Sequence, residues 1–131
     1  DHSPTILEYL DIPIPDRFQG SSVLGRVRGT DEGKTQIHYE KDIQGEVSDI
    51  VDDPDRALMW VVRDNDYKYV QFGDEAIPPL LFDLKSDPDE FHNLADDPTH
   101  MPTVLTYCQK LLRWRMKHED QRMSHWHARH K

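Results

Sequence analysis

The sequence predicts a small α+β domain. An antiparallel sheet of three to four strands packs against one amphipathic C-terminal helix, with a short N-terminal helix and long loops. Apolar runs at 57–62 and 67–72 flank the polar turn Asp64-Asn65-Asp66, which is typical of an antiparallel hairpin. Beyond residue 103, apolar residues recur at helical spacing, which predicts a helix with one face on the sheet.

The N-terminal helix is predicted to begin at Ser3, a suitable N-cap, with Pro4 in its first turn. Its apolar face consists of Ile6, Leu7 and Leu10. Pro13 and Pro15 end the helix, because proline lacks the backbone donor that a helix interior needs. The following segment, 16–34, contains several Gly and Ser residues and is predicted as loop.

The remaining strands are predicted at 36–39 and 80–84. Between the first two strands, residues 41–56 hold six Asp and Glu residues and are predicted as a long loop. Alternation along 67–72 divides that strand into two faces. One face carries Tyr67, Tyr69 and Gln71, and the other carries Lys68, Val70 and Phe72.

The C-terminal helix is predicted to start either at Asp97-Pro98, which offers an N-cap and an N1 proline, or at Pro102. Its predicted apolar stripe is Val104, Leu105, Cys108, Leu111, Leu112 and Arg115. Arg113 and Lys117 suit the negative pole of the helix dipole. The basic tail 119–131 has little to bury.

A chain of 131 residues has the length of one modest domain and is short for a complete doubly wound or barrel enzyme. Its net charge of −9 argues against a nucleic-acid partner. There is no apolar run of 18 residues, so no membrane partner is expected. The single Cys fits a reducing compartment, and a cytoplasmic location is expected. Residues 101–131 carry seven Lys and Arg against two Asp and Glu, a surplus that could contact an acidic surface.

Several groups could bind metals, but none predicts a site. Asp1-His2 lacks further ligands at fixed spacing. The acidic segment 42–55 offers oxygens for Ca²⁺ without the Asp-x-Asp-x-Asp-Gly pattern, so a solvated loop is favoured. Four histidines lie within 13 residues, but such exposed tails more often bind metals adventitiously. They are His118, His125, His127 and His130.

Candidate catalytic residues are equally weak. Cys108 lies among leucines on the helix face without a His one turn away, which favours a packing role. His38 and Glu40 share one face of a strand and could serve acid–base catalysis or pair at an edge; a structural role is favoured. The sequence contains no Gly-rich phosphate loop, Gly-x-Ser-x-Gly or His-Glu-x-x-His. We therefore assign no catalytic residue and no metal ligand, and the substrate-binding residues stay unknown.

Three motifs, in order along the chain, resemble the region that follows the catalytic core of sulfatases. They are Asp1-x-x-Pro4-Thr5-Ile6-Leu7 with Gly20-x-Ser22-x-Leu24, Arg63-x-x-x-Tyr67-Lys68-Tyr69, and Leu81-Phe82-Asp83-Leu84-x-x-Asp87-Pro88-x-Glu90-x-x-Asn93-Leu94-Ala95. Two further segments are similar to the phosphonate monoester hydrolase branch, although Lys41 stands where that branch has an aromatic residue. These are His38-Tyr39-Glu40-x-Asp42 and Leu112-x-Trp114-Arg115-x-Lys117-His118-x-Asp120.

The resemblance implies the C-terminal fragment of a hydrolase of the alkaline phosphatase superfamily that cleaves sulfate or phosphonate/phosphate esters. Residues 1–34 would end the catalytic domain, 35–118 would form the C-terminal subdomain, and 119–131 a basic His-rich tail. The family's divalent metal and formylglycine are expected in the missing N-terminal domain, because Cys108 lacks the C/S-x-P-x-R context. The fragment should be inactive, pack on its own N-terminal catalytic domain and join a homo-oligomer. The alternative is a stand-alone protein-binding module.

Overall fold

The computed structural model describes residues 1–18 and 20–118, so the predicted tail 119–131 lies outside the described residues. The chain divides into two compact units, Asp1–Thr35 and a second that begins at Gln36. The first unit holds helices α1 (His2–Tyr9) and α2 (Leu24–Val27). The second holds β1 (Ile37–Asp42), α3 (Gln44–Val47), η1 (Pro54–Arg56), β2 (Leu58–Arg63), β3 (Tyr67–Phe72), β4 (Leu80–Asp83), η2 (Pro98–His100) and α4 (Met101–His118).

Helix α1 starts earlier than the sequence predicted. Its N-cap is Asp1 and not Ser3, because the Asp1 carbonyl accepts hydrogen bonds from both the backbone N (3.1 Å) and the Oγ1 (2.6 Å) of Thr5. Pro4 is buried and lies in the first turn of the helix. Backbone N–H groups of the first turn have no partner within the helix, so the N–H that proline lacks is not needed there. The helix ends at Tyr9, ahead of the two prolines as expected.

The segment 16–34 is not wholly loop, since it contains the single turn α2. The hydroxyl of Ser22 accepts a hydrogen bond from Leu24 N at 3.1 Å, and Leu24 is buried. The Thr5 hydroxyl accepts another from Val23 N at 3.0 Å. A Cβ at Gly20 would lie 2.8 Å from Asp1 N, which explains why glycine stands there. The motif residues of this unit therefore hold α1 and α2 together.

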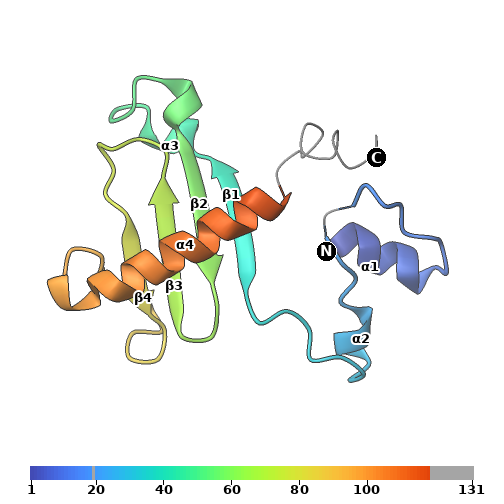
Figure 1. Cartoon of the computed structure of the whole chain (residues 1–131). Helices are drawn as coiled ribbons and strands as arrows, with labels where there is room; N and C mark the ends of the chain where they lie inside the picture. Colours follow the sequence, from blue (N-terminus) through green and yellow to red (C-terminus); the bar gives the residue numbers. More distant parts are fainter. Residues whose placement is uncertain (19, 119–131) are drawn as a thin grey trace, which may run out of the picture. The chain divides into compact units, whose positions relative to one another are not determined.

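The four strands form one antiparallel sheet in the order β1-β2-β3-β4 (Figure 1). Strand β3 has its predicted bounds, and β1 is longer than predicted because it continues to Asp42. In the register, Val62 of β2 lies opposite Tyr69, and Tyr69 lies opposite Leu81 of β4. These three side chains point to the same face and form the centre of the core.

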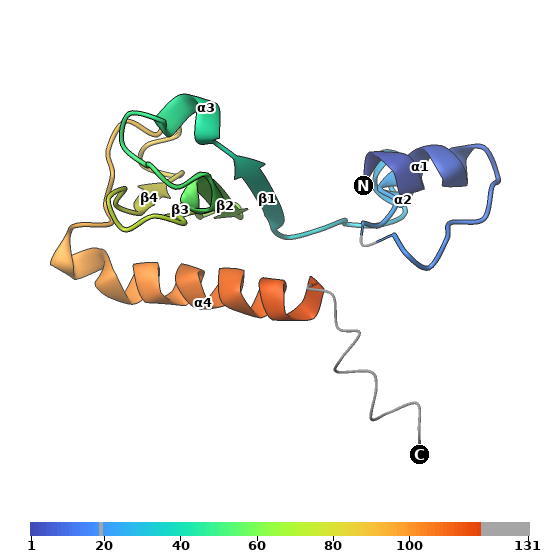
Figure 2. The ribbon, with the colours of Figure 1, turned by 90° about the horizontal axis from the view of Figure 1, so that it is seen from above.

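Helix α4 covers that face of the sheet (Figures 1 and 2). Tyr107 and Leu111 of the helix pack against Val62, Tyr69 and Leu81, each of which is at most 2% exposed. Fully burying such side chains contributes about 1.5–3 kcal/mol each to stability. The sheet and helix thus form one hydrophobic core.

The apolar stripe predicted for α4 is partly wrong. Val104, Cys108 and Leu111 face the core, but Leu105 and Leu112 are 57% and 59% exposed. The buried aromatic residue of the helix is Tyr107, which the predicted stripe omitted. Helix α4 has two adjacent rows of apolar residues, and the sheet covers only one of them. The helical spacing alone does not show which row is covered.

The segment 41–56 is also not the predicted long loop. It contains the end of β1, helix α3 and the short η1 turn. Ile43, Val51 and Ala57 form a second small core here, with Met59 and Phe72 of the sheet packed against it. In Figure 2, α3 and α4 lie on opposite sides of the sheet. The acidic residues occupy the solvent side of an ordered structure.

Of the helices within 1–18 and 20–118, none combines the length and apolarity needed to cross a bilayer.

Candidate functional site

His38 and Glu40 lie on the α4 side of β1, as their alternation predicted. The His38 ring stacks on Trp114 of α4, with 4.5 Å between centroids and planes 8° apart. Trp114 also stacks on His118, with centroids 4.6 Å apart. The Glu40 carboxylate accepts a hydrogen bond from the Arg115 guanidinium at 3.0 Å. Both candidates therefore hold the last turns of α4 on the edge of the sheet.

The Arg115 guanidinium also lies over the Trp60 ring, 4.1 Å from its centroid. Trp60 stands opposite Glu40 in the register of β1 and β2. Cation, carboxylate and aromatic ring thus form one contact between α4 and two strands. The segment that resembles the phosphonate monoester hydrolase branch supplies Trp114, Arg115 and His118, which have packing roles here.

The other candidates do not meet in a site. Cys108 packs against the main core, in agreement with a packing role. The Asp1 carboxylate accepts hydrogen bonds from Lys34 Nζ at 2.6 Å and Ser21 N at 2.9 Å, so it closes the first unit. His125, His127 and His130 lie outside the described residues. Among residues 1–18 and 20–118, no three His, Cys, Asp or Glu side chains are grouped to hold a metal ion.

The loop after β4 is held by Asn93. Its Oδ1 accepts hydrogen bonds from Leu81 N (2.9 Å) and Ala95 N (3.0 Å), and its Nδ2 donates to Pro79 O (3.3 Å). Leu94 N donates to Leu81 O at 2.8 Å. One amide side chain therefore satisfies two backbone donors and ties the loop to the edge of β4. Asn93 therefore has a structural role in the motif.

Two acidic residues of the same motif complete the loop. The Asp87 carboxylate accepts a hydrogen bond from His92 N at 2.8 Å, and its pKa is lowered, chiefly by that bond. Glu90 has a positive φ of 61° and forms ion pairs with Lys68 (2.5 Å) and Arg63 (3.6 Å). These contacts hold the loop against β2 and β3.

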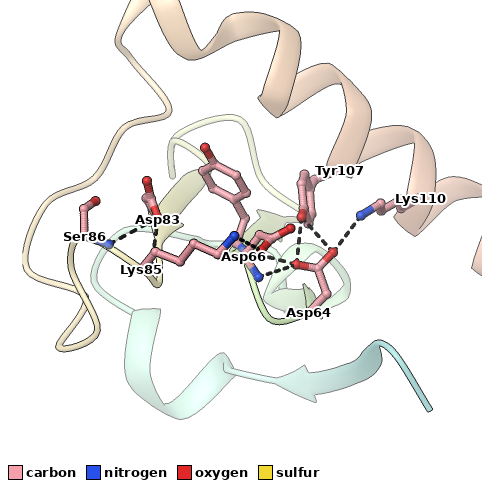
Figure 3. A network of polar contacts seen from close by, with 8 residues as sticks. Asp64, Asp66, Asp83, Lys85, Ser86, Tyr107 and Lys110 are labelled. Carbon is pink, nitrogen blue, oxygen red and sulfur yellow. Dashed lines mark hydrogen bonds and ion pairs between the residues drawn. The ribbon is translucent and has the colours of Figure 1, made fainter. Parts of the chain in front are cut away.

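Asp64 anchors α4 to the hairpin (Figure 3). Its carboxylate accepts hydrogen bonds from the Tyr107 hydroxyl at 2.8 and 2.7 Å and from Lys110 Nζ at 2.7 Å. It also accepts from the backbone N of Asp66 (2.9 Å) and Tyr67 (3.0 Å), which closes the turn. One side chain thus shapes the β2–β3 turn and fixes the helix over it.

The surroundings of Asp64 favour its ionised form. Burial raises the pKa of its carboxyl, but the hydrogen bonds from Lys110, the Tyr67 backbone and Tyr107 outweigh burial and lower the pKa to about 2. The reverse effect acts on Tyr107, whose hydroxyl pKa is raised by burial and by the Asp64 carboxylate. The anchor is therefore a charge-assisted contact at the edge of the core.

Sequence reasoning identified Asp64 as a turn residue and missed its contact with the helix. Tyr107 and Lys110 are spaced i, i+3, so they lie on the same side of α4. This shared side is the one feature of the sequence that indicates a common partner for Tyr107 and Lys110. It does not identify that partner as the Asp64 carboxylate, which lies 43 residues before Tyr107 in the chain.

The described fold is a two-layer α+β domain in which the specific polar side chains serve packing and loop closure. The chain belongs to the family described as N-sulphoglucosamine sulphohydrolase, C-terminal, whose model matches residues 1–117. This confirms the resemblance to sulfatases.

Two curated relatives cover most of the chain. The multifunctional alkaline phosphatase superfamily protein PehA of Trinickia caryophylli is 40% identical over 138 aligned positions, which span 98% of this chain and 26% of that protein. Arylsulfatase K of Homo sapiens is 35% identical over 98 positions, or 72% of this chain and 18% of that protein.

Among solved structures, the phosphonate monoester hydrolase of Agrobacterium radiobacter matches with a TM-score of 0.76 and 32% identity, over 93% of this chain and 25% of that one. The chain thus spans about a quarter of the length of PehA and of this hydrolase. These matches also support the similarity to phosphonate monoester hydrolases.

We expect Asp64→Asn to lower the free energy of unfolding of the 131-residue chain by about 2 kcal/mol at pH 7, the equivalent of its pKa shift. The folded pKa lies below the ordinary value of 3.8, so the carboxylate's contribution is complete above about pH 4 and is lost as pH falls toward about 2. Urea unfolding between pH 6 and pH 3 measures both effects. Asp66→Asn, which removes an exposed ion pair with Lys85, is the control and should change stability by less than about 0.5 kcal/mol. Parallel pH profiles for Asp64→Asn and the unchanged chain would contradict the assignment.

Asn93→Ala should destabilise the chain by about 1–3 kcal/mol, because Leu81 N and Ala95 N both lose their acceptor. Urea unfolding at neutral pH measures this loss. His92→Ala is the matched control, since the His92 side chain is 81% exposed and its backbone N keeps the bond to Asp87. Equal stability of the two variants would show that the Asn93 side chain does not hold the loop.

Proposed function

We propose that this chain is the C-terminal domain of a hydrolase that cleaves sulfate or phosphonate/phosphate monoesters. The observation that supports this most directly is the match of residues 1–117 to the C-terminal sulphohydrolase family. The names of the relatives support the same range of esters, since they include an arylsulfatase and a phosphonate monoester hydrolase. The choice between sulfate and phosphonate is left to experiment.

The chemistry is proposed to lie outside this domain. The divalent metal and formylglycine of the family require a grouped ligand set and a Cys or Ser in a C/S-x-P-x-R motif. The described residues do not fit either group: they contain no cluster of three ligands, and Cys108 is followed by Gln-Lys-Leu-Leu and packs on the core. We therefore derive no catalytic step through this domain.

The role of this domain is packing on the N-terminal catalytic part and shaping the wall of its cleft. The chain's coverage of about a quarter of PehA supports such a larger partner. The first unit supports it as well, because α1 buries only Pro4 among its own residues while Ile6, Tyr9 and Leu10 are more than half exposed. We also propose a cytoplasmic location, which the single Cys favours.

The product of the intact gene should release phenol from an aryl sulfate or an aryl phosphonate monoester, and the 131-residue chain should show no turnover with either ester. The denatured mass of the gene product, freshly expressed, is measured first and should be several times 15.4 kDa. A mass near 15.4 kDa, or turnover by the 131-residue chain itself, would contradict the proposal.

We further propose that the intact enzyme is a homo-oligomer in which residues 119–131 take part. Residues 101–131, which include this segment, carry seven Lys and Arg against two Asp and Glu, and this positive surplus on an otherwise acidic chain supports a contact between subunits. Deleting 119–131 from the intact enzyme should lower its molar mass in light scattering more than it lowers kcat. An unchanged mass would rule out this role.

A further inference from the structure

Helix α4 carries a second apolar row beside the one that packs on the sheet. The row, called the outer row here, consists of Met101, Leu105, Leu112 and Met116, which are between 52% and 63% exposed. Their spacing of 4, 7 and 4 residues keeps them on one narrow stripe, because an α-helix completes about two turns in 7 residues. The outer row is thus an apolar surface separate from the core.

The outer row is symmetric along the helix. Its centre falls between positions 108 and 109, and the two leucines lie equally far from this point, as do the two methionines. If a second α4 lies antiparallel across the first, Leu105 of each helix is opposite Leu112 of the other, and Met101 is opposite Met116. A two-fold interface requires this reciprocity, since residue i of one copy meets residue j of the other and j meets i.

The charges around α4 favour the same antiparallel pairing. Residues 101–109 contain no charged residue, whereas the exposed cations Arg113 and Lys117 lie in the second half of the helix. Asp96 and Asp97 directly precede η2 at the opposite end. In the antiparallel pair, Lys117 of one copy lies opposite position 100 of the other, about one helical turn from these two carboxylates. A parallel pair would instead place like charges side by side and align the two helix dipoles.

We propose that the outer row of α4 is a contact between two copies of this protein, in which the helices pair antiparallel about a two-fold axis near positions 108 and 109. The inference rests on the homo-oligomer of the proposed function and assigns a surface through which its subunits meet. Both the apolar row and the charge pattern match their own reverse. This favours a second copy over an unrelated partner, because only a two-fold contact requires such a match.

The size of the row makes it one contact of a larger interface. A stable protein interface uses about 20–30 residues from each side. The outer row supplies four residues from each copy. Other parts of the intact protein must therefore complete the interface, and the test uses the intact gene product.

Disulfide cross-linking tests both the contact and its direction. The test variant combines Leu105→Cys and Leu112→Cys with Cys108→Ala, which removes the native thiol of the helix. The antiparallel pair brings position 105 of each copy beside position 112 of the other. Mild oxidation should therefore join most chains into a covalent dimer of twice the chain mass, which a reductant reverses, and peptide mass spectrometry should identify the 105–112 link. Within one helix the two positions are about 10 Å apart along the axis, which is too far for an internal disulfide.

Two controls share the Cys108→Ala background. Leu105→Cys alone and Leu112→Cys alone should not cross-link, because the two copies of either position are about 10 Å apart along an antiparallel pair. Thr106→Cys combined with Arg113→Cys has the same spacing and exposure but lies outside the outer row. It measures chance collisions and should cross-link about tenfold less than the test variant, because its cysteines do not meet across the pair.

Three results would overturn the proposal. In the first, the test variant cross-links no more than the 106/113 pair, which means that the outer row is not a contact between copies. In the second, either single cysteine cross-links to its own counterpart, which means that the helices pair in parallel. In the third, the covalent dimer forms without a 105–112 link. Failure of the proposed function is a distinct result, namely that the unchanged protein hydrolyses neither ester.

Discussion

The structure of this domain depends on the packing of one helix on one face of a four-stranded sheet. Val62, Tyr69 and Leu81 are buried on three successive strands, and Tyr107 and Leu111 cover them. Apolar burial drives this contact but does not fix the position of the helix along the sheet. The Asp64 carboxylate supplies that position, because Tyr107 and Lys110 must both reach it. The hairpin turn and the helix are therefore placed by the same side chain.

The residues that carry the sulfatase resemblance have structural roles in the described residues. Asn93 satisfies backbone donors at the edge of β4, Asp87 closes the following turn, and Thr5 joins α1 to the segment before α2. Each is a short polar side chain whose hydrogen bonds replace those of regular secondary structure. Such residues are hard to substitute, so they mark the family. They carry no information about which ester is cleaved.

The residues that the sequence offered as catalytic candidates on β1 have packing roles in the structure. From the sequence, His38 and Glu40 could be taken for active-site residues. In the structure, His38 stacks on Trp114 and Glu40 pairs with Arg115, and both contacts fix the end of α4.

The sequence by itself determined the fold class, the hairpin, the helix near the C-terminus and the family, because these follow from local periodicity, turn residues and short motifs. It also placed His38 and Glu40 on one face, since alternation along a strand is local. Tertiary structure decided which apolar rows are buried: Tyr107 is covered whereas Leu105 and Leu112 are exposed, and 41–56 folds around Ile43 and Val51. It also brought Asp64 to α4 across 43 residues of sequence. Such contacts depend on where separate elements meet in space, and local spacing does not record that.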